Sequence, residues 1–257
     1  MRIIFLGTSS GKSSLNRYHS SLLFSLHNYN LLIDTGDGIS RALINNKINF
    51  NSISGILFTH LHPDHFSGFP ALIVQMKMMK RKETLEIFVH QSLLNVVKEF
   101  LINSYLLSER MSFKIEFKTF NDNKKFEVIE DFNFTARKNT HLSDLKKYQS
   151  EHPELSLYSA SFLFEANSKK IIYTSDIGGE EDLLLFREIK PDLFIVELTH
   201  ISLQSILKNS EKLQPALIYL THYSDEDTHS LNEILANLSS TIKQKIVLAE
   251  DSILVDF

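Results

Sequence analysis

Three imidazoles and one carboxylate lie within six consecutive residues of this chain, at His60, His62, Asp64 and His65. They directly follow the apolar run 55–58, whose length and composition predict a strand. Side chains placed where a strand turns into a loop can direct several ligand atoms at one centre. Imidazole and carboxylate together suit zinc and other borderline metals. The spacing therefore predicts a metal site, and a histidine-rich loop exposed to solvent is the alternative.

The composition narrows the chemistry that such a site can use. The chain of 257 residues contains no cysteine, which excludes disulfides, thiolate metal ligands and a cysteine nucleophile. Lys and Arg number 27 against 31 Asp and Glu, and a net charge of −4 gives no overall attraction to nucleic acid or anionic lipid. We therefore expect any catalysis to depend on hydroxyls, carboxylates, imidazoles, cofactors or metals.

The elements that must position these residues alternate between strand-like and helix-like patterns. Helices are predicted at 70–82, 92–107, 180–188 and 230–242. Strands are predicted at 2–7, 21–26, 30–35, 55–60, 85–90, 113–120, 132–137, 161–166, 170–176, 193–198, 217–222 and 245–251. This mixture indicates the α/β or α+β class. No linker rich in Gly, Pro or Ser interrupts the chain, so we expect a single domain over residues 1–257.

The N-terminal sequence indicates where the protein is found. Its apolar run breaks at Gly7 and is too short for a secretory signal. No uncharged apolar stretch approaches the roughly 20 residues of a membrane span. We therefore expect a cytoplasmic protein that does not enter the membrane.

The pattern His60-x-His62-x-Asp64-His65 resembles the signature of the metallo-β-lactamase fold superfamily. The opening FLGTSSG and the phrase LLIDTGDG, which contains Asp34, also resemble superfamily motifs, and the similarity extends to the closing VLAEDSILVDF. The resemblance implies a four-layer αββα sandwich built from two similar halves.

Further ligands are implied by the resemblance, because the superfamily's remaining ligands have counterparts in the expected order. By this resemblance one metal is held by His60, His62 and His141, the other is held by Asp64, His65 and His222, and Asp176 bridges the two. The cofactor would be two divalent metal ions, zinc in the first place, with manganese or iron as alternatives. Two cations about 3.5–4 Å apart lower the pKa of a shared water toward about 7.

Two carboxylates receive roles beside that water. Asp64 is predicted to be catalytic, because it could orient the hydroxide or accept its proton. Asp34 is predicted to hydrogen-bond a ligand imidazole, so that the correct nitrogen faces the metal. The alternative for Asp34 is a loop aspartate that caps the helix after Gly38.

Local motifs indicate the branch of the superfamily. The segments LLIDTGDGISRAL, FTHLHPDHFSGFPALI and LTHYS are most similar to ribonuclease Z and small-molecule phosphodiesterases, which implies phosphodiester hydrolysis. His200 would then be a catalytic general acid in a shifted position. In ribonuclease Z the corresponding histidine precedes a glutamate, at the position of Val196, whereas His200 lies three residues after Glu197. The alternative is a surface or helix-start histidine.

Two features separate this chain from ribonuclease Z. Only 34 residues lie between His141 and Asp176, which leaves little room for the arm that grips transfer RNA, and no arginine-rich run is present. A small phosphodiester is therefore as well supported as RNA. Resemblance to ribonuclease Z also implies a homodimer. The main alternative activity is hydrolysis of a lactone or thioester on the same metals. Redox relatives carry a carboxylate at the position of His62, and a non-catalytic scaffold would be expected to have lost ligands.

Overall fold

A computed structural model describes residues Met1–Phe257, and the chain divides into two compact units. The first unit comprises Met1–Thr8, Leu15–Asn121 and Asp251–Phe257. The second unit comprises Ser9–Ser14 and Asp122–Glu250. Each unit is described by itself, and the single domain over residues 1–257 stays a prediction.

The first unit is built on a seven-stranded mixed sheet in the order β14-β1-β2-β3-β4-β5-β6. Its strands are β1 (Arg2–Gly7), β2 (Ser21–Leu26), β3 (Tyr29–Ile33), β4 (Gly55–Leu57), β5 (Leu85–His90), β6 (Ile115–Phe120) and β14 (Leu254–Asp256). Its helices are α1 (Ile39–Asn45), α2 (Pro63–Phe66), α3 (Phe69–Met78) and α4 (Leu94–Asn103), with short 3-10 turns at η1 (Phe50–Ser52), η2 (Gln91–Leu93) and η3 (Ser108–Arg110). Strands β3 to β6 pair in parallel, and the others pair antiparallel.

The second unit has a sheet of the same size, in the order β13-β12-β11-β10-β9-β8-β7. Its strands are β7 (Lys125–Ile129), β8 (Phe132–Lys138), β9 (Ala160–Ala166), β10 (Lys169–Tyr173), β11 (Leu193–Glu197), β12 (Leu217–Thr221) and β13 (Ile246–Leu248). Its helices are α5 (Leu203–Leu213), α6 (Thr228–Ala236) and α7 (Ser240–Lys243), with 3-10 turns at η4 (Ser143–Tyr148), η5 (Glu180–Leu184) and η6 (Asp225–Asp227). Strands β10 to β13 are parallel, so each unit joins an antiparallel part to a parallel part.

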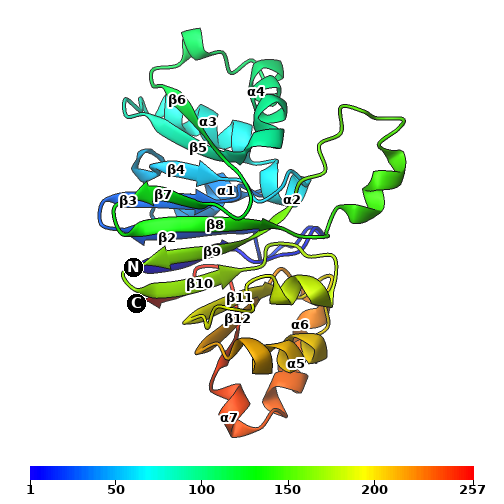
Figure 1. Cartoon of the computed structure of the whole chain (residues 1–257). Helices are drawn as coiled ribbons and strands as arrows, with labels where there is room; N and C mark the ends of the chain where they lie inside the picture. Colours follow the sequence, from blue (N-terminus) through cyan, green and yellow to red (C-terminus); the bar gives the residue numbers. More distant parts are fainter. The chain divides into compact units, whose positions relative to one another are not determined.

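The core of the second unit lies between its sheet and helix α5 (Figure 1). Phe194 and Val196 of β11 belong to one apolar cluster with Leu203, Ile206 and Leu213 of α5. Burying each such side chain contributes about 1.5–3 kcal/mol relative to leaving it exposed. Helix α5 was not among the predicted helices, although its buried residues recur at helical spacing.

The predicted helices differ from the structure in length, number or type: the one at 70–82 is α3, which ends at Met78, and the one at 230–242 is the pair α6 and α7. The helix predicted at 92–107 is α4, in which the buried residues are Val97 and Leu101, whereas Val96 and Phe100 are exposed. The apolar stripe is therefore narrower than the pattern indicates. The helix predicted at 180–188 is the 3-10 turn η5, in which the Asp182 side chain accepts the backbone N–H groups of Thr140 and Gly178.

The parallel strands of both units present their carboxyl ends to loops that carry the predicted site residues. Asp34 follows β3, His60 follows β4, and His222 follows β12. Asp34, Ser175 and His222 adopt the left-handed conformation, with φ of 59°, 53° and 55°. This conformation costs a non-glycine residue about 1–3 kcal/mol, and it turns the chain sharply out of each strand. Loops at the carboxyl ends of parallel strands are where α/β sheets commonly bind ligands.

The N-terminal loop of the first unit is held by a residue from the far end of the sequence. Asp251 accepts hydrogen bonds from the backbone N–H of Thr8 at 2.9 Å and from that of Tyr18 at 2.7 Å. It also accepts one from the Thr8 hydroxyl at 2.8 Å. Strand β14 follows it and pairs antiparallel with β1. Burial raises the pKa of the Asp251 carboxyl, and these hydrogen bonds act in the opposite direction.

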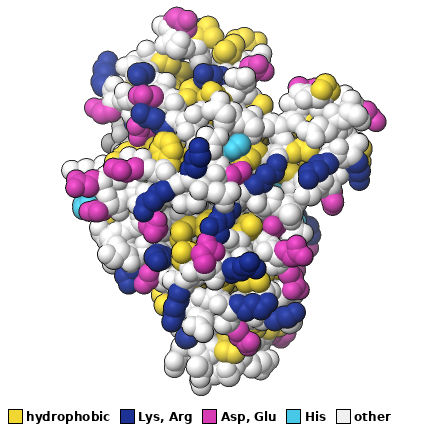
Figure 2. Space-filling view, viewed as in Figure 1, with side chains coloured by type: hydrophobic (Ala, Val, Ile, Leu, Met, Phe, Trp, Pro, Cys, Tyr) yellow, Lys and Arg dark blue, Asp and Glu magenta, His cyan; other side chains and the backbone are white.

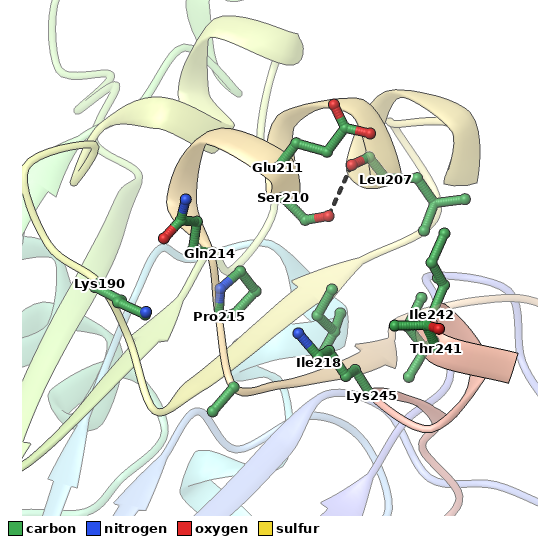
Figure 3. A pocket seen from close by; sticks show the side chains of 12 residues that line it. Lys190, Leu207, Ser210, Glu211, Gln214, Pro215, Ile218, Thr241, Ile242 and Lys245 are labelled. Atoms are coloured by element: carbon green, nitrogen blue, oxygen red, sulfur yellow. Dashed lines mark hydrogen bonds between the residues drawn. The ribbon is translucent and has the colours of Figure 1, made fainter. Parts of the chain in front are cut away.

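A groove of about 700 Å³ lies in the second unit between α5, α7 and the amino ends of β12 and β13 (Figure 3). Ile218 and Ile246 line it, together with the side chains of Lys190 and Lys245. It opens at the end of the parallel strands opposite the loop that carries His222, and no predicted site residue lines it.

None of the helices has the length and apolar character that crossing a membrane requires.

Candidate metal centre

The first unit gathers four metal-capable side chains between β4 and α2. His60 and His65 are buried. The ring centroid of His60 lies 4.8 Å from that of His62 and 4.2 Å from that of His65. Pro63 occupies the first turn of α2, where its fixed φ suits the start of a helix. Asp64 and His65 follow within the same short helix. The local sequence therefore brings the predicted imidazoles together by a strand end and one helical turn.

Asp34 fixes which nitrogen of two histidines is available. Its carboxylate accepts hydrogen bonds from the Thr59 backbone N–H at 2.9 Å and from the Thr59 hydroxyl at 2.8 Å. It also lies 2.8 Å from Nδ1 of His65, which must be the protonated nitrogen to make this bond. Since the Thr59 hydroxyl donates to Asp34, it accepts from Nδ1 of His60 at 3.1 Å. Both histidines are thus left with a lone pair on Nε2.

Asp34 therefore orients the His65 imidazole, and its role toward a metal ligand stays a prediction. Helix α1 begins after Gly38 without any side-chain capping bond, so Asp34 caps no helix there. Burial raises the pKa of the Asp34 carboxyl, and its contacts with His65 and Thr59 act in the opposite direction.

Gly36 permits the loop after β3 to approach the metal-site loop of the first unit. A Cβ atom at this position would lie 2.3 Å from the backbone oxygen of Asp64 and 2.6 Å from Cβ of His19. Such contacts are far below the van der Waals limit, and one of them is with backbone. Only glycine is accommodated without moving the loop.

In the second unit one carboxylate lies between two imidazoles. Oδ2 of Asp176 is 3.7 Å from Nε2 of His141, and Oδ1 is 3.4 Å from Nε2 of His222. The side chains of all three residues are buried, and they come from the loops after β8, β10 and β12. The structure thus brings together the three ligands that the sequence placed in the second half of the chain.

The tautomer of His222 is set by Thr199, a residue that was not predicted. The Thr199 hydroxyl donates to the backbone oxygen of His222 at 2.6 Å, so it accepts from Nδ1 of the same histidine at 3.0 Å. Nε2 of His222 then carries the lone pair that faces Asp176. Thr199 lies close to His222 because β11 pairs in parallel with β12, and the sequence alone does not predict this pairing.

We expect Thr199→Val to weaken zinc binding by about 10- to 100-fold, because loss of such an outer hydrogen bond frees the ligand ring. Titration of the metal-free protein with zinc against a competing chelator measures the change. Thr199→Ser keeps the hydroxyl and serves as the matched control, with affinity near that of the unmodified protein. Equal affinities for the two variants would contradict the role given to Thr199.

His200 lies beside the ligands of the second unit and is held by Glu197. Oε1 of the buried Glu197 is 2.9 Å from Nδ1 of His200, and Oε2 accepts the His200 backbone N–H at 2.9 Å. The His200 ring centroid is 4.8 Å from that of His141 and 6.4 Å from that of His222. Helix α5 starts only at Leu203, so His200 is not its first residue. Its side chain is 36% exposed.

Both units contribute residue types that suit a divalent metal. Residues of both belong to groups of His and Asp that could hold a metal ion: His60, His62, Asp64 and His65 in the first unit, and His141, Asp176 and His222 in the second. Imidazole and carboxylate suit zinc, manganese and iron alike. The hydrogen bonds of Thr59, Asp34 and Thr199 orient the rings of His60, His65 and His222, as outer partners do in metal sites.

Comparison with known proteins places this arrangement in context. Residues 1–247 match the model of a family described as anti-Pycsar protein Apyc1. A ribonuclease Z of Saccharolobus islandicus (strain L.S.2.15 / Lassen #1) is 41% identical over 118 residues, which are 46% of this chain and 39% of that protein. The match thus spans about two-fifths of the length of this curated relative.

Two solved structures are similar over nearly the whole chain. The metallo-β-lactamase fold protein YhfI from Bacillus subtilis has a TM-score of 0.77 at 16% identity, covering 99% of this chain and 98% of its own. The short form of human tRNase Z has a TM-score of 0.71 at 20% identity, covering 100% and 99%. At these identities the structures show the fold alone. The predicted fold class is confirmed: two mixed sheets with helices form the metallo-β-lactamase fold.

Proposed function

This chain belongs to the family described as anti-Pycsar protein Apyc1, and we propose that it is a metal-dependent phosphodiesterase acting on small phosphodiesters. The observation that carries the proposal is the Asp176 carboxylate, whose two oxygens face Nε2 of His141 and of His222 with His200 alongside. A carboxylate placed in this way can bind two cations, and the neighbouring histidine can protonate the leaving group.

In the proposed centre the ligands of both units act together. One divalent ion is assigned to His60, His62 and His141, the other to Asp64, His65 and His222, and Asp176 is the bridge. Bound there, two cations would lower the pKa of a shared water and neutralise charge on the phosphoryl oxygens. Zinc is the proposed ion, with manganese or iron as alternatives.

Two residues of the chain, Asp64 and His200, are assigned the two proton transfers of the reaction. Asp64 lies 3.8 Å from Nε2 of His65 with 13% of its side chain exposed, so its carboxylate can orient the attacking water and accept its proton. His200 is assigned the opposite task. With Nδ1–H bound to Glu197, its Nε2 can donate a proton to the leaving alkoxide, and the buried carboxylate of Glu197 stabilises the cationic ring.

The face drawn in Figure 2 supports a small substrate more than RNA. In Figure 2, Lys and Arg side chains are interspersed with Asp and Glu over the face in view, with no continuous basic stripe. Residues 142–156 project from the ends of β8 and β9 with the short turn η4 (Figure 1). The homodimer and the cytoplasmic location stay predictions.

The proposal is tested by hydrolysis of a chromogenic phosphodiester with purified protein of known metal content. A chromogenic lactone and a thioester are run in parallel, because the same metals could act on a carbonyl carbon. We expect turnover of the phosphodiester alone. Turnover of the lactone or thioester with an inert phosphodiester would overturn the proposal. If the phosphodiester is cleaved, assays with 3′,5′-cyclic nucleotides and with RNA 3′ ends distinguish a small substrate from RNA.

A further inference from the structure

A buried carboxylate outside the ligand set joins the two loops that carry His141 and Asp176. Asp182 lies in η5 and is 4% exposed. Its Oδ2 accepts hydrogen bonds from the Thr140 backbone N–H at 3.0 Å and from the Thr140 hydroxyl at 2.7 Å. The same oxygen accepts from the Gly178 backbone N–H at 2.8 Å. Thr140 directly precedes one ligand, and Gly178 lies two residues after the other.

The two loops approach so closely that a side chain is excluded between them. A Cβ atom at Gly178 would lie 2.4 Å from Oγ1 of Thr140 and 2.6 Å from its carbonyl carbon and oxygen. The backbone atoms among these cannot move aside without shifting the loop after β8. Gly178 is therefore an independent sign that the separation of the loops is fixed.

Asn139 makes a second tie on the same loops. Its Nδ2 donates to the backbone oxygen of Asp176 at 2.8 Å, and its Oδ1 accepts the backbone N–H of His141 at 3.3 Å. Asn139 thus connects the backbones of the two ligands themselves. Asp182 carries the larger part of the connection, because it is charged and accepts three donors on one oxygen.

We propose that Asp182 is a positioning residue, which sets the separation of His141 and Asp176 and thereby the zinc affinity of the protein. The proposal rests on the proposed function only in taking these two residues as metal ligands. Without the Asp182 carboxylate, the N–H groups of Thr140 and Gly178 would lose their partner, and the loops would part to let water reach them. The imidazole and the carboxylate would then no longer meet at the 3.7 Å seen here.

The test measures zinc affinity, not turnover. Metal-free protein is titrated with zinc in competition with a chromogenic chelator, and the lack of cysteine removes interference from thiolates. We expect Asp182→Ala to weaken zinc binding by about 10- to 100-fold, as observed for outer partners of metal ligands. Asp182→Asn retains an acceptor oxygen and is expected to recover part of the loss.

Asp192→Ala is the matched control. Asp192 also accepts a backbone N–H in the second unit, from Lys170 at 2.9 Å, and it binds Nζ of Lys169 at 3.0 Å. It precedes β11, at the opposite end of the parallel strands from the ligand loops. We expect this variant to lower the thermal midpoint of the metal-free protein while leaving zinc affinity within about twofold of the unmodified protein.

The outcomes separate positioning from a purely structural role. If Asp182→Ala and Asp192→Ala lower the thermal midpoint alike and neither changes zinc affinity, the proposal is overturned. If Asp182→Ala does not fold, Thr140→Ala removes only the hydroxyl bond, and unchanged zinc affinity in that variant would also overturn it. If zinc affinities separate as expected while phosphodiesters remain uncleaved, the proposed function fails and the role of Asp182 stands.

Discussion

Asp176→Ala is expected to abolish phosphodiester turnover while leaving most of the fold intact. The substitution removes the one carboxylate whose two oxygens face His141 and His222, at 3.7 and 3.4 Å. It removes little apolar volume, since Asp176 follows β10 and is not part of the apolar cluster of the second unit. Activity and bound metal are measured on the same preparation, with circular dichroism as the check of folding.

Two further variants sharpen this result. Asp192→Ala removes a carboxylate from the same unit away from the ligand loops, and it is expected to retain activity. His62→Ala tests the first unit in the same way and should also abolish turnover, because it removes a proposed ligand that lies 4.8 Å from His60 between ring centroids. Full activity in either Asp176→Ala or His62→Ala would end the two-metal proposal.

His200→Ala is expected to slow hydrolysis of a 3′,5′-cyclic nucleotide by about 10²- to 10⁴-fold, the usual effect of removing a general acid. The leaving group of this substrate is an alkoxide, which needs a proton as it departs. A nitrophenyl phosphodiester has a leaving group that is stable as an anion, so its hydrolysis should fall much less. Steady-state kinetics with both substrates measures the difference.

Comparing the two substrates distinguishes loss of a general acid from an indirect effect of the substitution on the neighbouring imidazole rings. If His200 only supported the rings of His141 and His222, at 4.8 and 6.4 Å, its loss would slow both substrates equally. Glu197→Gln keeps a hydrogen-bond acceptor for Nδ1 but removes the charge, and it should show the same preference to a smaller degree. A loss below tenfold with the cyclic nucleotide would remove His200 from the mechanism.

The two halves of the site differ in how far the sequence could predict them. His60 to His65 are contiguous, so a strand end and one helical turn suffice to bring them together, and composition with spacing indicates a metal site. His141, Asp176 and His222 are far apart in sequence, and their assignment depended on a family resemblance. Their meeting requires the pairing of β8 to β12, which is a property of the folded sheet.

The residues that orient the ligands could not be predicted for the same reason. Thr199 reaches His222 only because β11 and β12 pair in parallel, and Asp182 reaches Thr140 across two loops. Helix α5 is different, because its buried residues recur at helical spacing and the local pattern was sufficient to predict it. Local pattern finds ligands that are adjacent in sequence, whereas outer hydrogen-bond partners follow from tertiary structure.

The first unit begins the chain, but the ribosome completes it only after the second unit. The strands β7 to β13 of the second unit all leave the ribosome before Asp251 and β14, which the first unit needs for its sheet edge and for Thr8 and Tyr18. Domains made first usually fold first during translation. Here β1 of the nascent first unit lacks its outer partner until β14 has emerged, so β1 is an unpaired strand edge while β7 to β13 are being made.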